Sequence, residues 1–244
     1  VEDGGPGKRM NEAARLDLRK GAGIAPLQSL IGEPVVPAIP ALVVDGIRQS
    51  YGNVAAVDDV SFSLAHGEIL ALAGHSGSGK STLLRVIAGL EHPASGRVTI
   101  NGREVCGGGR FVPSENRGVG LVFQDYALFP HMTVAENLSF PLEVRGMSKS
   151  DREAKVNNAL DMVQMGEFGG RRPAQLSGGQ QQRIALARAL VFDAELVLMD
   201  EPLGALDKQL REHMQYEIKH IHERLGVTVV YVTHDQSEAL TMSD

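Results

Sequence analysis

A glycine-rich segment that ends in a lysine and two hydroxyl residues carries the clearest chemistry. Residues 74–82 read Gly-His-Ser-Gly-Ser-Gly-Lys-Ser-Thr and match the pattern G-x-x-x-x-G-K-[ST]. Glycines let the backbone curl so that N–H groups face a phosphate, and the helix that follows adds partial positive charge. The alternative is a turn that only caps a helix. The predicted phosphate-binding residues are Gly74, Ser76, Gly77, Ser78, Gly79, Lys80, Ser81 and Thr82.

Two carboxylates form a second candidate group. Asp200 and Glu201 directly follow the apolar run Leu196–Met199 and precede a proline. A carboxylate at the end of a buried strand can bind Mg²⁺, and its neighbour can polarise water. By itself such a pair is equally typical of a solvated turn. The phosphate pattern elsewhere in the chain favours the chemical interpretation.

A third group lies at the start of a predicted helix. Ser177 has the residue type of an N-cap, and Gly178 and Gly179 stand in the first turn, where good helix formers are expected. Glycine costs helix propensity, so the bare backbone needs another reason. Close approach of an anionic ligand is the physical candidate.

Short apolar strands must position these groups. Runs rich in Val, Ile and Leu alternate with segments of helical period, which predicts a parallel sheet flanked by helices. Polar residues or glycine follow each run, and ligands of such sheets bind outside the carboxyl ends of the strands. One crevice is therefore expected. The four runs are Ile69–Ala73, Val119–Phe123, Leu196–Met199 and Thr228–Val232.

Composition excludes several classes of protein. The 244 residues carry a net charge of −6, which disfavours a nucleic-acid partner. No window is apolar for the roughly 18 residues that a membrane helix needs. The single cysteine, Cys106, allows no internal disulfide. Residues 1–40 are rich in Gly and Pro and are interpreted as a disordered leader.

Over residues 41–244 these motifs resemble the ATP-binding subunit of ABC transporters. Leu176–Gln180 is identical to the signature motif of that family, and Gly204–Asp207 resembles its D-loop. Three single residues fall at the matching positions of the family pattern, although Tyr51 alone would suit a half-buried strand. They are the adenine-stacking Tyr51, the Q-loop Gln124 and the switch His234.

The resemblance implies an α/β fold with a P-loop NTPase core, a mostly parallel sheet flanked by helices. It adds an N-terminal antiparallel β-subdomain and a helical subdomain over about residues 125–185. Two copies pair head to tail, with each ATP between the phosphate loop of one and the signature segment of the other. The resemblance therefore adds six residues to the predicted ATP-binding residues: Tyr51, Ser177, Gly178, Gly179, Gln180 and Asp207.

The resemblance also assigns catalytic roles. Glu201 orients or deprotonates water, and His234 holds the γ-phosphate and that water. Gln124 senses the metal, and Asp207 links the paired sites. ATP and Mg²⁺ are the implied cofactors. The implied catalytic residues are Glu201, His234, Gln124 and Lys80, and the implied metal ligands are Ser81, Gln124 and Asp200.

Among ABC transporters, the resemblance favours an importer whose ATP-binding subunit lies at the cytoplasmic face of the membrane, because exporters generally carry fused membrane helices. Its implied partners are permease subunits and, indirectly, a solute-binding protein. The apolar stretch Asp125–Met132 is expected to bind the permease; the alternative is that this stretch is an edge of the hydrophobic core. Asp207–Met214 and Leu240–Asp244 are most similar to polyamine importers of spermidine and putrescine. Ferric iron, sulfate, molybdate and sugars remain alternative solutes, and a soluble non-transport ABC ATPase is the alternative class.

Further expectations concern helix ends and histidines. Thr133 with Glu136, and Ser150 with Glu153, are predicted capping boxes. Relatives continue beyond His234 with further strands, so the chain is expected to be truncated at its C-terminal end. Three histidines of the predicted helix 207–225 lack the spacing of a metal site and are interpreted as a solvated face. They are His213, His220 and His222.

Overall fold

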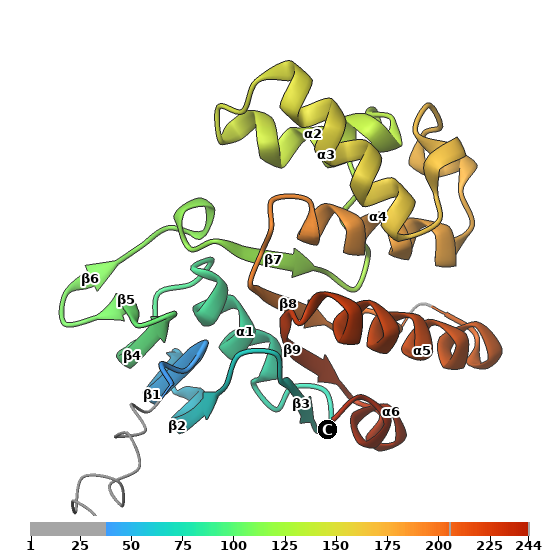
Figure 1. The fold of residues 1–244 in the computed structure, drawn as a ribbon. Helices are drawn as coiled ribbons and strands as arrows, with labels where there is room; N and C mark the ends of the chain where they lie inside the picture. The colour runs from blue at the N-terminus through green and yellow to red at the C-terminus, as the bar shows by residue number, and fades with distance from the viewer. Residues whose placement is uncertain (1–37, 205, 244) are drawn as a thin grey trace, which may run out of the picture. The chain divides into compact units, whose positions relative to one another are not determined.

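The computed structural model describes residues 38–204 and 206–243, so nearly all of the predicted leader lies outside the described residues. The described residues form two sheets (Figure 1). The antiparallel sheet has the strand order β2 (Val54–Leu64), β1 (Leu42–Tyr51), β4 (Ser95–Ile100), β5 (Arg103–Gly107) and β6 (Arg110–Phe111). The parallel sheet has the order β3 (Ile69–Ala73), β9 (Thr228–Thr233), β8 (Leu196–Asp200) and β7 (Val119–Val122).

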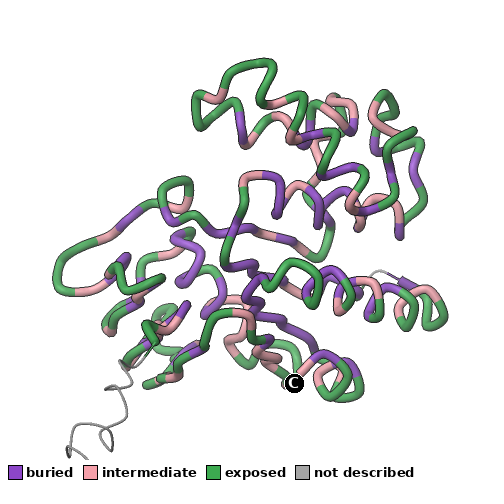
Figure 2. Tube along the Cα trace, viewed as in Figure 1, coloured by how far each residue is buried: buried purple, intermediate pink, exposed green. Residues whose placement is uncertain are grey.

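Both faces of the parallel sheet are covered. Leu196 and Leu198 of β8 belong to a core shared with the antiparallel sheet and α1 (Lys80–Ala88). Val197 and Met199 alternate with them and belong to a second core. Figure 2 shows β8 and β9 as buried through most of their length. Burial on both faces explains why these strands read as continuous apolar runs rather than as alternating ones.

The second core is built from the remaining helices. It contains buried side chains from each of them. The helices are α2 (Val134–Val144), α3 (Lys149–Met162), α4 (Gly178–Leu190), α5 (Lys208–Leu225) and α6 (Gln236–Met242). Between residues 38 and 204, three single-turn 3-10 helices connect other elements, at Ser114–Asn116, Gly166–Phe168 and Pro173–Gln175. The predicted fold class, a parallel α/β core with an antiparallel β-subdomain and a helical insertion, is confirmed.

Within the described part of the chain, no helix is long and apolar enough to cross a membrane.

One predicted helix start is correct and the other is wrong. Thr133 and Glu136 form the expected capping box at α2. At α3 the cap is Ser148, whose hydroxyl accepts from the N–H of Asp151, instead of Ser150. Both serines have a carboxylate three residues later, and the earlier one starts the helix.

The histidine prediction holds for two of three residues. His213 and His220 are exposed, whereas His222 is buried and its Nε2 lies 2.9 Å from the carbonyl oxygen of Gly67. The last turn of α5 rests on the loop before β3, which buries the ring. No group of three metal-binding side chains occurs among the described residues.

Candidate functional site

The phosphate-loop pattern lies between the end of β3 and the start of α1, at the carboxyl edge of the parallel sheet (Figure 1). Gly79 caps α1 with φ +86°, and a Cβ built there would lie 1.9 Å from the main-chain oxygen of Ala56. Gly77 also has a positive φ, +81°, but a Cβ there would face open space. Glycine therefore occupies the two positions for different structural reasons. Gly79 packs closely against β2, whereas Gly77 leaves the surface of the loop open.

Lys80 points back across this loop. Its ammonium donates to the carbonyl oxygens of Gly74 and His75 at 2.7 and 2.9 Å and to the hydroxyl of Ser78 at 3.1 Å. A cavity of 590 Å³ beside the loop is lined by Gly74, Gly79 and Lys80 together with residues of β2 and β3. The positive charge thus lies at the centre of a curled backbone, as phosphate binding requires.

Two pairs of predicted residues meet at the same edge. The Ser81 hydroxyl donates to Asp200 Oδ1 at 2.8 Å, which joins the start of α1 to the end of β8. His234 Nδ1 lies 3.1 Å from Glu201 Oε2, which joins the ends of β9 and β8. Glu201 has a φ of +47°, a left-handed conformation that is uncommon outside glycine and is concentrated at functional sites.

His234 is held in place by its neighbours. Asp235 caps α6 by accepting from the N–H groups of Ser237 and Glu238 at 2.7 and 3.3 Å, and these two bonds lower the pKa of its carboxyl. Thr233 Oγ1 donates to the buried Glu238 carboxylate at 2.6 Å. The imidazole therefore projects from a turn whose two sides are both fixed.

Gln124 follows β7 and lies near the turn after Glu201. A Cβ on Gly204 would lie 3.4 Å from Gln124 Nε2. The Gln124 side chain is exposed and close to the segment that carries Glu201.

Tyr51 is the last residue of β1, and its ring is half exposed. Its hydroxyl donates to Glu91, which also accepts from Gln49 Nε2 at 2.8 Å. The bond to Glu91 is the main reason that the pKa of the Tyr51 phenol is raised, and a bond with Thr82 acts in the opposite direction. Tyr51 thus lies beside the first turn of α1 with its ring available for stacking.

The signature segment is built differently from the phosphate loop. Ser177 and Gln180 form a capping box, in which Ser177 Oγ accepts at 3.3 Å and Gln180 Oε1 accepts at 2.9 Å. Asp207 caps α5 by accepting from the N–H of Leu210 at 2.9 Å. Among the described residues, no hydrogen bond joins Ser177–Gln180 or Asp207 to residues 74–82. The fold therefore brings the loop, Asp200, Glu201 and His234 together, but not these two elements.

The sequence did not reveal the role of Arg188 on α4. Its guanidinium donates to the carbonyl oxygens of Tyr126 and Ala127 at 2.9 and 2.6 Å. Both acceptor residues have a positive φ. The sequence contains one signal of this role, a charged residue within the apolar run 184–190. Its partners could not be identified from that signal, because they lie about 60 residues earlier in the sequence.

Arg188 also lines an apolar groove of 350 Å³. The groove lies between α2, α4 and β7, and Phe129 of the predicted apolar stretch forms part of its wall. Its aromatic lining residues are Phe123, Phe129, Phe140 and Phe192.

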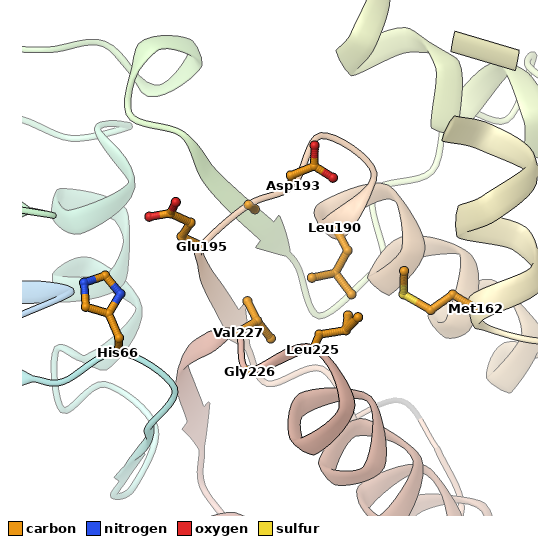
Figure 3. Close-up of a pocket in the computed structure, with 9 residues that line it drawn as sticks. His66, Met162, Leu190, Asp193, Glu195, Leu225, Gly226 and Val227 are labelled. Atoms are coloured by element: carbon orange, nitrogen blue, oxygen red, sulfur yellow. The ribbon is translucent and has the colours of Figure 1, made fainter. Parts of the chain in front are cut away.

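A separate cavity of 290 Å³ lies at the opposite, amino-terminal edge of the parallel strands (Figure 3). Both of its acidic side chains have partners: Asp193 pairs with Lys155 at 2.5 Å, and Glu195 accepts from Asn101 at 2.5 Å. None of the predicted site residues lines it.

Comparison with known proteins agrees with this geometry. Residues 57–204 match the family model described as ABC transporter. The spermidine/putrescine import ATP-binding protein PotA of Pseudomonas aeruginosa (strain UCBPP-PA14) is 50% identical over 204 residues, which cover 84% of this chain and 55% of that protein. The sulfate/thiosulfate import ATP-binding protein CysA of Mycobacterium tuberculosis (strain ATCC 25618 / H37Rv) is also 50% identical, with 84% and 57% covered.

A solved structure is similar as well. The ATP-binding cassette MJ0796, a dimer in a post-hydrolysis state bound to ADP and Pi, is 33% identical with a TM-score of 0.70, over 82% of this chain and 91% of that chain. The chain spans little more than half the length of the curated relatives that it matches, 55% for PotA. The family model covers most of the described residues and includes the phosphate loop, the signature segment and the acidic pair, and the chain belongs to the ABC transporter family.

Proposed function

We propose that this chain is the ATP-hydrolysing subunit of an importer. The observation that carries the proposal is the convergence of Lys80, the Ser81–Asp200 pair and the Glu201–His234 pair at one edge of the parallel sheet. Phosphoryl transfer needs mainly positioning and charge stabilisation, and these groups supply both.

ATP would lie along this edge. Lys80 would exchange its loop acceptors for the β- and γ-phosphates, with the N–H groups of residues 74–82 around them. The half-exposed Tyr51 ring would stack on adenine, and the hydrogen bond to Glu91 would restrain the ring.

The residues near Ser81 suit a magnesium ion. Mg²⁺ prefers oxygen ligands, and the Ser81 hydroxyl and the Asp200 carboxylate already point at each other 2.8 Å apart. Gln124, which lies near Gly204, would supply a further oxygen ligand. The ion would supply charge neutralisation for the phosphates.

Glu201 is the proposed base. Its carboxylate would orient water for in-line attack on the γ-phosphate and accept the proton. His234, 3.1 Å away, would fix that carboxylate and contact the γ-phosphate. Lys80 would stabilise the charge on the phosphoryl oxygens.

A second copy would complete each site. Ser177–Gln180 and Asp207 do not reach the phosphate loop of their own chain, which supports a head-to-tail dimer in which they approach the ATP of the partner. A similar cassette has been solved as a dimer with ADP and Pi.

The apolar groove beside Arg188 would receive the permease, and the chain would act at the cytoplasmic face of the membrane. We propose a polyamine as the solute, from the resemblance of residues 207–214 and 240–244. Sulfate is the competing candidate because CysA is as similar as PotA. Uptake of labelled spermidine and of labelled sulfate by cells without this gene separates the two: loss of spermidine uptake alone supports the proposal.

Glu201→Gln tests the catalytic assignment. The variant keeps ATP affinity because the amide has the same shape, and its turnover falls by about 10²–10⁴-fold because it lacks the base. ATP should then trap a dimer, which size-exclusion chromatography with light scattering detects. If this variant hydrolyses ATP at the wild-type rate, Glu201 is not the catalytic base. Stimulation of the wild type by DNA, without association with any membrane subunit, would favour the soluble ATPase class instead.

A further inference from the structure

Gln124 lies in a tight turn directly after β7, and this turn, Phe123–Tyr126, is called the Gln124 turn below. The N–H of Tyr126 closes it by donating to the carbonyl oxygen of Phe123 at 2.9 Å. Gln124 and Asp125, the two residues between them, are exposed. The position of the Gln124 side chain therefore depends on what holds the end of the turn at Tyr126.

Arg188 of α4 holds this end of the turn. Its guanidinium donates to the carbonyl oxygens of Tyr126 and Ala127 at 2.9 and 2.6 Å. In the part of the chain that the structure describes, it is the one side chain that hydrogen-bonds to the main chain of residues 123–127. The Tyr126 ring is buried in the core that also contains α4. The turn is therefore attached to α4 twice, by this ring and by the arginine.

The backbone at the attachment is strained. Tyr126 and Ala127 have φ angles of +61° and +45°, and such left-handed residues outside glycine persist only where their surroundings fix them. The next part of the loop is held separately, because the buried Asn137 of α2 accepts from the N–H of Phe129 at 2.8 Å and donates to its carbonyl oxygen at 3.2 Å. Loss of Arg188 should therefore release the Gln124 turn and leave the rest of the loop in place.

The other side of the turn faces the acidic end of β8. A Cβ on Gly204 would lie 3.4 Å from Gln124 Nε2 and 3.4 Å from the carbonyl oxygen of Glu201. The Gln124 amide is thus next to the segment that carries the proposed base. A shift of the turn would move this amide away from that segment.

We propose that Arg188 is a positioning residue for Gln124. By fixing the end of the Gln124 turn on α4, it keeps the Gln124 amide beside Gly204, where the amide would serve as a ligand of Mg²⁺. Among the described residues, no hydrogen bond joins Arg188 to the phosphate loop, so its effect passes through Gln124. This inference rests on the proposed function, because that function makes Gln124 a metal ligand.

Arg188→Met tests the inference, because it removes both donors and keeps an apolar stem. Displacement of Gln124 should lower kcat by about 10–100-fold. Affinity for a fluorescent ATP analogue in EDTA should stay within about 2-fold of the wild type, since Lys80 and Tyr51 are untouched. The gain in affinity that added Mg²⁺ causes should be smaller than in the wild type, and this measurement needs no turnover.

Arg188→Lys is the second variant, in case the methionine variant does not fold. It keeps the charge but loses the planar fork that reaches two carbonyl oxygens, so its kcat should lie between those of the wild type and Arg188→Met. A kcat of Arg188→Lys equal to that of the wild type, with a folded Arg188→Met that is equally active, overturns the inference and leaves the proposed function intact.

A double-mutant cycle shows whether Arg188 acts through Gln124. Gln124→Ala alone sets the scale of the loss. Addition of Arg188→Met to Gln124→Ala should then change kcat by no more than about 2-fold, because the positioned amide is already absent. Two losses of kcat that multiply overturn the inference, since Arg188 would then act on another part of the site.

Arg183→Met is the matched control on the same helix. Arg183 pairs with Glu217 and donates to the carbonyl oxygen of Val163 at 3.4 Å, away from the Gln124 turn. Its loss should lower the melting temperature, as Arg188→Met does, but leave kcat and the effect of Mg²⁺ unchanged. Equal loss of kcat in the two variants overturns the inference, because it indicates a general structural role. A wild type that does not hydrolyse ATP overturns the proposed function, and the inference with it.

Discussion

The phosphate loop and the signature segment are both glycine-rich starts of helices, yet their glycines do different things. In the loop, Gly77 and Gly79 have positive φ, so the backbone path itself requires glycine. In the signature segment, Gly178 and Gly179 are ordinary helical residues whose missing side chains face Leu206 and Leu210 of the same chain.

The polar groups differ in the same way. Lys80 is directed into the curled loop, whereas Ser177 and Gln180 bond to each other at the helix end. The loop is therefore curled around its lysine, whereas the signature segment is a packed helix end, which in the proposed dimer would face the partner copy. Similar composition does not imply similar structural reasons, and substitutions can separate the two.

Gly79→Ala should have the largest effect. The new Cβ would lie 1.9 Å from the Ala56 carbonyl oxygen, and φ is +86°. A left-handed alanine costs about 1–2 kcal/mol, and displacement of β2 should bring the total to at least about 3 kcal/mol. Thermal unfolding measures the loss of stability, and titration with a fluorescent ATP analogue measures the loss of binding.

Gly77→Ala is the matched control. It carries the same left-handed penalty, about 1–2 kcal/mol, but its Cβ would face open space. Equal destabilisation by the two alanines would show that contact with β2 does not matter at Gly79.

Ser177→Ala should have an intermediate effect. Loss of the N-cap bond to Gln180 costs about 1 kcal/mol, or a melting temperature lower by about 2–4 °C. If the signature segment also meets the ATP of a partner, turnover falls further than the loss of stability explains. Calorimetry and steady-state ATP hydrolysis on the same samples separate the two effects.

Ser177→Asp distinguishes the roles more sharply. Aspartate caps a helix as well as serine does and suits the positive end of the helix dipole, so stability should be kept. Its charge would repel a phosphate, so ATP-dependent dimers should disappear. A fully active Ser177→Asp variant would mean that the signature segment does not approach the nucleotide.

Much of the site was predictable because it depends on topology. Residues at the carboxyl ends of adjacent parallel strands must lie close together, so the meeting of Glu201 with His234 follows from the apolar runs that form β8 and β9. Ser81 and Asp200 follow or end strands at the same edge of the sheet, with β9 between them, and they meet because α1 begins at that edge. The apolar runs of β8 and β9 can be recognised in the sequence because these strands are buried on both faces.

What the sequence did not reveal depends on packing between distant segments. The burial of His222 depends on Gly67, and the role of Arg188 depends on two left-handed residues before α2. No local pattern encodes either contact. The cap of α3 was misplaced for a local reason, because Ser148 and Ser150 both satisfy the same short motif.

Gly178→Ala should have the smallest effect on stability, and its sign is opposite to that of Gly79→Ala. Its Cβ would make an ordinary contact, 3.4 Å from Leu206, and alanine favours a helix by about 0.5–1 kcal/mol, so the melting temperature should rise by about 1–4 °C. Gly179→Ala gains less, because its Cβ would lie 3.2 Å from Leu210. If packing within the chain were the whole reason for these glycines, Gly178→Ala would be as active as the wild type. A more stable protein with lower ATP turnover would instead mean that the backbone at Gly178 is kept bare for a ligand on the partner copy.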